Sequence, residues 1–327
     1  MKKMTSALIA SLLCMGIAGC SQADPAGTDQ PTETGNAEYS VGIVQLVAHP
    51  ALDAATQGFQ DVLKEEFGDS VTFHYQEAAG DSATCVTIAN TFVNEGVDLI
   101  MANATPALQA AASATNQIPI LGTSITEYGV ALDISDFNGT VGGNISGTSD
   151  LAPLDQQAAM FDEILPDAKK IGIIYCNAEA NSVYQAEVVK AELEKSGHTV
   201  TVYTFTDSND VASVTQQAVS ENDALYIPTD NTAASCTEAI NNVAMPAGIP
   251  IITGEEGIAS GCGIATLSIN YYDLGRTTGE MAVRILKGED ISTMPVEYFL
   301  NPVKKYDAER AKALGITIPD GYEPIEK

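Results

Sequence analysis

The chain of 327 residues contains no tryptophan, only three histidines and few basic side chains. With 15 lysines and arginines against 43 aspartates and glutamates, its formal net charge is −28. Such a surface repels nucleic acid and anionic lipid headgroups, so we expect neither as a partner. The histidines His49, His74 and His198 lie far apart, and no Cys-x-x-Cys or His-x-x-x-His spacing occurs. The sequence therefore predicts no metal site.

Several motifs of catalysis and cofactor binding are also missing. There is no Gly-x-Gly-x-x-Gly, no Walker loop and no Gly-x-Ser-x-Gly elbow, so we expect no cofactor. Cys176 ends a predicted strand, but no base lies near it in the sequence, which disfavours a catalytic thiolate. Beyond the N-terminal region no run of 18 apolar residues occurs, which predicts no membrane span in the mature chain. The sequence thus favours binding over enzymatic activity.

The N-terminus has the pattern of an export signal. Lys2 and Lys3 precede an apolar run, Ala7–Ile17, that is too short to cross a bilayer. The sequence Ile-Ala-Gly-Cys, which ends at Cys20, resembles a bacterial lipobox. It predicts a signal peptide at 1–19 and a diacylglycerol on Cys20 that anchors the protein to the membrane. An ordinary signal peptide with an incidental Cys20 is the alternative. Residues 20–39, acidic and without a basic side chain, are expected to form a flexible tether.

Four cysteines remain beyond the signal region: Cys85, Cys176, Cys236 and Cys262. On an exported chain they could form two disulfides in any of three connectivities. Buried free thiols are an equally acceptable interpretation, because a mature chain of about 308 residues can build a sufficient core without disulfides.

From Tyr39 onward, short β-branched runs alternate with longer segments of helical periodicity, and the pattern occurs twice. The first unit is expected to contain strands at 41–47, 71–76, 99–102 and 118–122, and helices at 51–66, 84–95 and 105–115. The second is expected to contain strands at 171–175, 199–204, 224–227 and 249–253, and helices at 182–196, 211–220 and 232–243. This order predicts an α/β protein with two doubly wound, Rossmann-like lobes of parallel strands. A Gly- and Asp-rich stretch, 139–155, is expected to cross between the lobes.

Ligands of open α/β sheets bind beyond the carboxyl ends of the strands, which locates the candidate residues. In the first unit these positions hold neutral donors, which suit a carboxylate. In the second they hold carboxylates and amides, which suit an ammonium group. The predicted ligand-binding residues are His49, Thr105, Thr123, Ser124, Asn181, Ser182, Asp230, Asn231 and Glu255.

Each of these residues also has an ordinary structural interpretation. Thr105 and Asp230 stand where helices begin, so either could serve only as a helix cap. Thr123 and Ser124 could be turn residues, and an isolated histidine such as His49 is more often structural than functional. Their clustering at strand ends favours a zwitterionic ligand, and the absence of Arg and Lys there disfavours a phosphate.

The strand-end segments also carry a family resemblance. His49–Asp53, Ala104–Ala107, Glu179–Ser182, Tyr226–Thr232 and Tyr271–Arg276 resemble the substrate-binding lipoproteins of ABC transporters, in the group that binds tryptophan and tyrosine. The resemblance covers about 40–325. It implies the type I periplasmic-binding-protein fold, with a ligand cleft between two lobes and three chain crossings. The first lobe would comprise 40–146 and 270–290, and the second 147–269 and 291–327.

The resemblance further implies site roles and partners. Thr105, Thr123, Ser124 and Ser182 would hold the carboxylate of the ligand, and Asp230 with Asn231 its amino group. The ligand would be an amino acid, expected to be aromatic, and the partners would be an ABC permease and its ATPase. At position 255 this chain has a glutamate, where members of this family often have a smaller acid or a polar residue. A sugar or nucleoside receptor of the same fold, and an exported hydrolase, are the alternatives.

Overall fold

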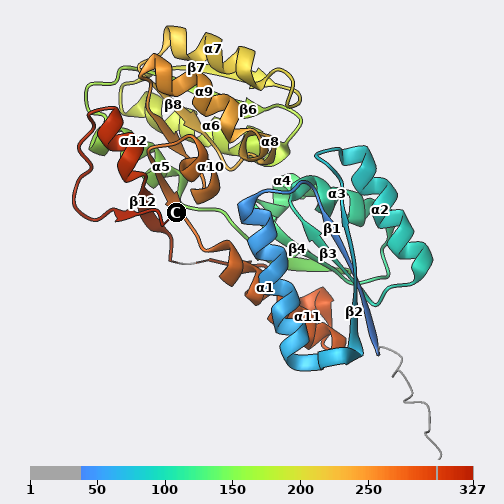
Figure 1. Ribbon diagram of the computed structural model, residues 1–327. Coiled ribbons are helices and arrows are strands. Elements are labelled where there is room, and N and C mark those ends of the chain that lie inside the picture. Colours follow the sequence, from blue (N-terminus) through green and yellow to red (C-terminus); the bar gives the residue numbers. More distant parts are fainter. Residues whose placement is uncertain (1–37, 300, 327) are drawn as a thin grey trace, which may run out of the picture. The chain divides into compact units, whose positions relative to one another are not determined.

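The computed structural model of the protein describes residues 38–299 and 301–326, which form two β-sheets flanked by helices (Figure 1). The predicted signal peptide, Cys20 and the tether up to residue 37 lie outside the described residues. Among the described helices, none is both long and apolar enough to cross a membrane.

The first sheet has six strands in the order β11-β5-β4-β3-β1-β2, all parallel. These strands are β1 (Tyr39–Gln45), β2 (Val71–Glu77), β3 (Leu99–Asn103), β4 (Ile120–Ile125), β5 (Ile145–Ser149) and β11 (Glu297–Tyr298). The accompanying helices are α1 (Pro50–Phe67), η1 (Gly68–Ser70), α2 (Ser82–Glu95), α3 (Thr105–Ala114), α4 (Tyr128–Ala131), α11 (Tyr271–Leu286) and η2 (Ile291–Thr293). We call this sheet and its helices the first lobe.

The second sheet has seven strands in the order β13-β12-β10-β9-β8-β6-β7. These are β6 (Lys170–Cys176), β7 (Thr199–Phe205), β8 (Ala224–Ile227), β9 (Ile251–Thr253), β10 (Ala265–Ser268), β12 (Val303–Tyr306) and β13 (Glu323–Pro324). Its helices are α5 (Leu154–Ile164), α6 (Ala180–Lys195), α7 (Val211–Glu221), α8 (Asn231–Ser235), α9 (Thr237–Ala247), α10 (Glu256–Gly261) and α12 (Ala308–Ala313). We call this the second lobe. Only β12 runs antiparallel to its neighbour β10 among the described pairings.

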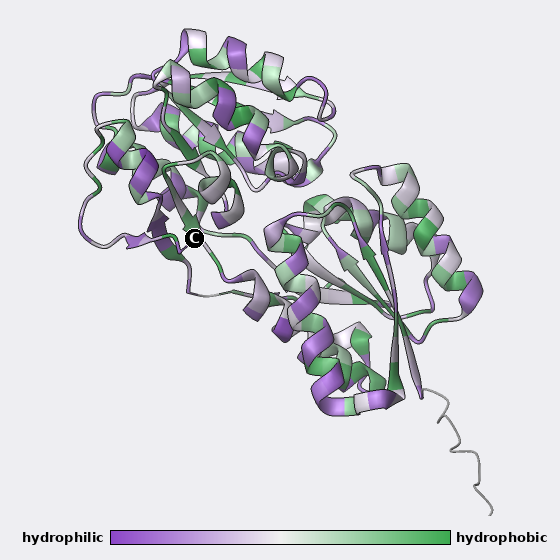
Figure 2. Ribbon diagram, in the orientation of Figure 1, coloured by the Kyte–Doolittle hydropathy of each residue, from purple (hydrophilic) through white to green (hydrophobic). Residues whose placement is uncertain are grey.

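Apolar side chains explain why both faces of each sheet are covered. The central strands are buried on both faces, as parallel strands require, and they are green in the hydropathy view of Figure 2. In the first lobe, Phe59 of α1 and Met281 of α11 pack on one face, and Phe92 of α2 and Leu108 of α3 pack on the other. The predicted α/β architecture of parallel strands is confirmed.

Two predicted boundaries are wrong. Residues 145–149 form β5, which pairs with β4 in the first sheet, so the first crossing begins after Ser149 and not at 139. The segment from 291, which was assigned to the second lobe, begins in the first, because its strand β11 pairs with β5 in the first sheet. The buried side chains of Ile291, Met294 and Val296 pack into the cores of the first lobe, and this burial holds the segment there. The chain returns to the second lobe as β12.

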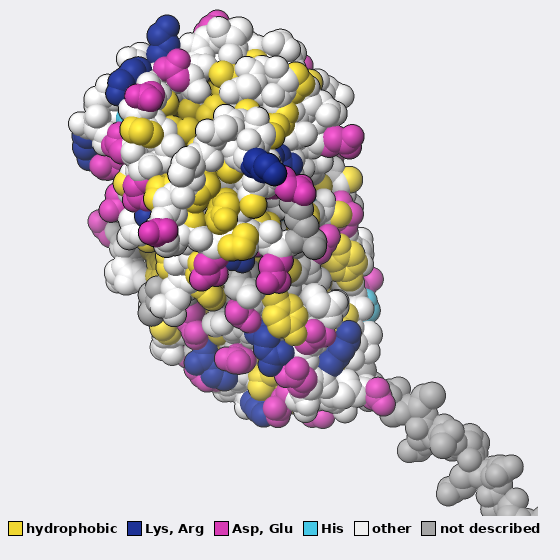
Figure 3. All heavy atoms as spheres, turned by 60° about the vertical axis from the view of Figure 1, so that its left-hand side comes forward, with side chains coloured by type: hydrophobic (Ala, Val, Ile, Leu, Met, Phe, Trp, Pro, Cys, Tyr) yellow, Lys and Arg dark blue, Asp and Glu magenta, His cyan; other side chains and the backbone are white. Residues whose placement is uncertain are grey.

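Ion pairs hold many of the basic side chains on the surface. Arg276 pairs with Glu65, Lys287 with Glu66, and Lys304 with Glu163. In the space-filling view of Figure 3, dark blue basic groups lie beside magenta acidic ones. The cations are far outnumbered by acids, so the surface retains its negative charge.

The helices α1 and α11 approach each other closely because glycines lie at their contact. A Cβ added to Gly275 would lie 2.0 Å from the carbonyl oxygen of Ala55, and one added to Gly58 would lie 2.2 Å from that of Tyr272. These distances leave no room for a side chain at either position. The contact returns α11 to the first lobe after the chain has built most of the second.

We expect Gly275→Ala to lower the free energy of unfolding by about 3 kcal/mol, because the added methyl group must push the two helix backbones apart. Urea unfolding would measure the change. Glu280→Ala, at an exposed position of the same helix, is the control and should change the stability by less than about 0.5 kcal/mol. Equal stability of both variants would contradict the close packing.

Candidate functional site

The carboxyl ends of the strands in the first lobe carry His49, Thr105 and Ser124, as predicted, and all three are buried. His49 has extended backbone geometry immediately before α1, which begins at Pro50 because proline is favoured in a first helical turn. Thr105 begins α3, and Ser124 lies at the end of β4. Ser124 and the neighbouring Ala104 have φ values of 56° and 90°. Non-glycine residues rarely adopt this left-handed geometry, and it is concentrated at binding sites.

The second lobe contributes a polar cluster around the buried carboxylate of Glu179. Its Oε1 accepts hydrogen bonds from the backbone N–H and the hydroxyl of Thr232, at 2.9 and 2.8 Å. Its Oε2 accepts from the backbone and side-chain nitrogens of Asn231, at 3.0 and 2.6 Å, and from Asn181 at 3.2 Å. Glu179 thereby fixes the orientation of two predicted site residues, Asn181 and Asn231.

The two sets of loops meet. His49 Nε2 lies 3.2 Å from Oδ1 of Asn231, and both residues are buried. The side-chain amide of Gln185, on α6, donates to the hydroxyl of Thr126 at 3.4 Å. Burial lowers the pKa of His49, so the imidazole is neutral near pH 7. The structure therefore brings the strand ends of both lobes to one place.

Asp230 is buried, and it has the capping role that was one of its two interpretations. Its Oδ1 accepts from the backbone N–H of Ala233 at 2.7 Å, which caps α8. Its Oδ2 accepts from the N–H of Cys176, at the end of β6, also at 2.7 Å. Burial, with the nearby charge of Glu179, raises the pKa of Asp230. Ser182, fully buried, hydrogen bonds to this carboxyl group.

Thr123 has its hydroxyl in a different environment from the predicted one. It lies 3.3 Å from the hydroxyl of Thr148, on β5, and accepts a hydrogen bond from the hydroxyl of Thr278, on α11, at 3.0 Å. The three buried hydroxyls connect the sheet to α11 inside the first lobe. The side chain of Thr123 thus serves the packing of this lobe.

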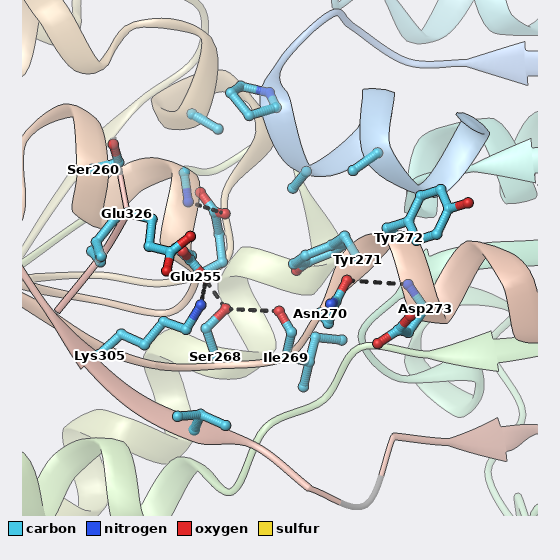
Figure 4. Close-up of a pocket in the computed structure, with 18 of the residues that line it drawn as sticks. Glu255, Ser260, Ser268, Ile269, Asn270, Tyr271, Tyr272, Asp273, Lys305 and Glu326 are labelled. Atoms are coloured by element: carbon cyan, nitrogen blue, oxygen red, sulfur yellow. Dashed lines mark hydrogen bonds and ion pairs between the residues drawn. The ribbon is translucent and has the colours of Figure 1, made fainter. Parts of the chain in front are cut away.

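Glu255 caps α10 and lines a cavity of about 800 Å³ beside the crossing from β10 to α11. Its two carboxylate oxygens accept from the backbone N–H groups of Gly257 and Ile258. In the close-up of this cavity in Figure 4, Tyr271 and Tyr272 point in opposite directions, with the Tyr271 hydroxyl toward Glu255. Burial raises the pKa of Glu255 to about 7.

Asp150, which directly follows β5, is a buried acid at a strand end that was not among the predicted site residues. Its Oδ2 accepts a hydrogen bond from the Tyr271 hydroxyl at 2.9 Å, and its Oδ1 is buried without a hydrogen-bonding partner. Burial raises the pKa of Asp150 to about 6, although the hydroxyls of Tyr271 and Thr126 act in the opposite direction. The sequence signal that could have identified Asp150 is its position directly after a strand. The strand itself, Ile-Ser-Gly-Thr-Ser, is too polar to be recognised as buried.

Buried polar atoms without a partner are concentrated at these strand ends. Leaving such an atom unpaired costs about 1–3 kcal/mol. The atoms from the two lobes are Nδ1 of His49, Oγ1 of Thr105, Oγ of Ser124, Oδ1 of Asp150 and Oδ1 of Asn181. They include both donors and acceptors, so a small polar ligand between the lobes would satisfy them.

Metal binding and thiol chemistry find no support in this arrangement. In the described part of the chain, no three His, Cys, Asp or Glu side chains gather in a way that could hold a metal ion. Cys85, Cys176, Cys236 and Cys262 are free thiols. Burial raises the pKa of Cys176 to about 11, which disfavours its thiolate.

Comparison with known proteins agrees with this geometry. Residues 40–322 match the family described as ABC transporter substrate binding protein. The chain belongs to this family. It is 36% identical over 304 residues to a tyrosine-binding protein of Clostridioides difficile (strain R20291), covering 90% of this chain and 87% of the relative. The predicted family and the predicted role as a substrate-binding protein are confirmed.

Two solved structures are similar over nearly the same span. The ABC domain from Streptococcus pneumonia in complex with L-Trp has 34% identity and a TM-score of 0.84, covering 88% of this chain and all of that one. A ligand-free, open substrate-binding protein with adhesive properties from Clostridium difficile has 36% identity and a TM-score of 0.67, covering 88% and 99%. At similar identity, the backbone agrees better with the L-Trp complex than with the open structure.

The buried acids predict a pH dependence of stability. The pKa of Glu255 is about 7 in the folded chain, against an ordinary 4.5. The folded state therefore binds a proton that the unfolded state has lost, and the free energy of unfolding falls as pH rises from about 4.5 to 7. A shift of this size corresponds to a contribution on the order of 3 kcal/mol. Asp150 and Asp230 act in the same direction.

We expect Glu255→Gln to flatten the pH dependence over that range, because glutamine does not titrate. Urea unfolding of the ligand-free protein at pH 5, 6, 7 and 8 would measure it for both chains. A wild-type protein that gains stability steadily over this interval would contradict the assignment of a raised pKa to Glu255.

Proposed function

We propose that the chain is the extracytoplasmic, lipid-anchored receptor of an ABC importer, and that it binds an aromatic amino acid between its two lobes without catalysing a reaction. The observation that carries the proposal is the group of five buried, unpartnered polar atoms that both lobes present at their strand ends. A zwitterion can supply the carboxylate and the ammonium that such a mixed set of donors and acceptors requires.

The relatives support the choice of ligand. One relative is a tyrosine-binding protein, and a related domain was solved in complex with L-Trp. The hydroxyls of Thr105 and Ser124 would donate hydrogen bonds to the carboxylate of the ligand. The N–H groups at the start of α3 add the favourable end of a helix dipole.

The contacts between the lobes support a mechanism of closure. The contacts of His49 with Asn231, and of Thr126 with Gln185 on α6, join residues of different lobes. A ligand that contacts both sets of loops binds more tightly when they are together than when they are apart. It therefore shifts the population toward the closed form, and a permease can distinguish that form from the open one.

The anchor follows from the sequence pattern at the N-terminus. A diacylglycerol on Cys20, followed by an acidic tether to residue 39, would hold the receptor near its permease. The tether would raise the effective concentration of the receptor at that membrane. Mass spectrometry of the membrane fraction should find Cys20 as the lipidated N-terminus.

A thermal-shift screen of the chain from residue 21 tests the ligand class. We expect L-tyrosine, L-tryptophan or L-phenylalanine to raise the melting temperature, since a ligand at a hundred times its Kd adds about 2.7 kcal/mol of stability. Common sugars and nucleosides are the comparison compounds. A shift with these alone would overturn the amino-acid assignment, and turnover of ester or amide substrates would overturn the non-catalytic role.

A matched pair of threonine variants tests the location of the site. We expect Thr105→Val to weaken ligand binding about tenfold while leaving the ligand-free stability unchanged or higher, because its buried hydroxyl has no partner. Thr278→Val should do the reverse: it removes hydrogen bonds to Thr123 and Thr148 and lowers the stability by about 1–2 kcal/mol. Calorimetric binding and urea unfolding measure both. Unaltered binding in Thr105→Val would contradict the proposed site.

A further inference from the structure

Four buried carboxylates lie at or beside the strand ends where the lobes meet: Asp150, Glu179, Asp230 and Glu255. A buried carboxylate is stable only when its oxygens accept hydrogen bonds or face a positive charge. The four differ in how many of their carboxylate oxygens accept a hydrogen bond from the protein itself. An oxygen without such a donor is free to interact with a ligand.

Three of the four are satisfied internally at both oxygens. Both oxygens of Glu255 accept backbone N–H groups of α10, and both oxygens of Asp230 accept backbone N–H groups at α8 and β6. Glu179 accepts from the backbone and side chains of Asn231 and Thr232, and from the side chain of Asn181. Their oxygens already accept hydrogen bonds from donors within the protein, and the same contacts fix the geometry of the loops.

Asp150 is different. Its carboxyl group interacts with two neutral hydroxyls, those of Tyr271 at Oδ2 and of Thr126, yet Oδ1 has no hydrogen-bonding partner although the side chain is only 5% exposed. Within the described residues, no Lys, Arg or His forms an ion pair with it. An acceptor that the fold has left unpaired in a buried place is suited to a cationic donor.

The neighbours of Asp150 place it in the site. Its backbone N–H donates to the carbonyl of Ile125, the residue after Ser124, whose hydroxyl also lacks a partner. Tyr271, its hydrogen-bonding partner, starts α11 at the crossing from the second lobe, and the Tyr271 hydroxyl also interacts with Thr229 of that lobe. Asp150 therefore lies beside the proposed carboxylate-binding hydroxyl and close to the opposite lobe.

We infer that Asp150, with its unpartnered Oδ1, binds the α-ammonium group of the ligand, and that Asp230 is a positioning residue that caps α8 and the end of β6. The assignment rests on the proposed function, because it takes the ligand to be an amino acid. It also makes the first lobe hold both charged ends of the zwitterion. The polar groups of the second lobe, such as Asn181, then close over the bound ligand.

The test compares L-tyrosine with 3-(4-hydroxyphenyl)propionate, which is the same molecule without its amino group. Isothermal titration calorimetry would measure the affinity ratio of the two compounds for wild type and for Asp150→Asn. We expect the wild-type protein to prefer tyrosine, and the variant to lose at least tenfold of this preference, because an ion-paired hydrogen bond becomes a neutral one.

The matched control is Asp223→Asn, which changes a carboxylate that accepts N–H groups of Lys169 and Lys170 at the opposite end of β6. It should retain the full preference for tyrosine. Retention of the full preference in Asp150→Asn would overturn the inference while leaving the amino-acid receptor intact. Failure of wild type to bind tyrosine, tryptophan or phenylalanine at all would instead overturn the proposed function.

A second measurement covers the case in which Asp150→Asn does not fold. In a crystal structure of the wild-type protein with the bound amino acid, the α-nitrogen should lie within about 3.2 Å of Asp150 Oδ1. An α-nitrogen bound by Asp230, Glu179 or Glu255 and not by Asp150 would overturn the assignment.

Discussion

The contact between α1 and α11 is the constraint on which the arrangement of the first lobe and its site depends. These helices are more than 200 residues apart in the sequence, yet Gly58 and Gly275 bring their backbones together. The contact fixes the first residue of α11, Tyr271, whose hydroxyl holds Asp150. It also fixes Thr278 against the sheet. A side chain at either glycine would displace all of these together, since packed backbones cannot yield independently.

A second feature that organises the site is that its buried carboxylates differ in how many hydrogen bonds they accept from the protein. Burying a carboxylate is costly, and Glu179, Asp230 and Glu255 offset that cost with hydrogen bonds from helix N-termini and neighbouring loops. These contacts fix the loops, while one polar atom in each of His49, Thr105, Ser124 and Asn181 stays unpaired. A site of this kind is preorganised, because a ligand restores hydrogen bonds that the fold alone leaves unmade.

Sequence reasoning located the region of the site but not the role of each member. His49, Thr105 and Ser124 were predictable because parallel strands end at one edge of a sheet, and the structure gathers them there. The environment of the Thr123 hydroxyl was not predictable, because it depends on Thr278, which lies 155 residues away. Asp150 was missed because a polar strand, β5, carries no hydrophobic signal. Which acids are satisfied by backbone donors depends on helix starts, and sequence reasoning places these only within a few residues.

The sequence by itself determined the alternation of strands and helices, the parallel sheets and the repetition of this pattern. Hydrophobic periodicity is a local property, so it can be recognised in the sequence before any tertiary contact is known. It also determined the strong negative charge. Only the tertiary structure decided that β5 and β11 belong to the first sheet and that Tyr271 meets Asp150. It likewise decided which polar atoms remain unpaired. These are pairings between distant segments, and their energies arise from burial and geometry that no short stretch of sequence contains.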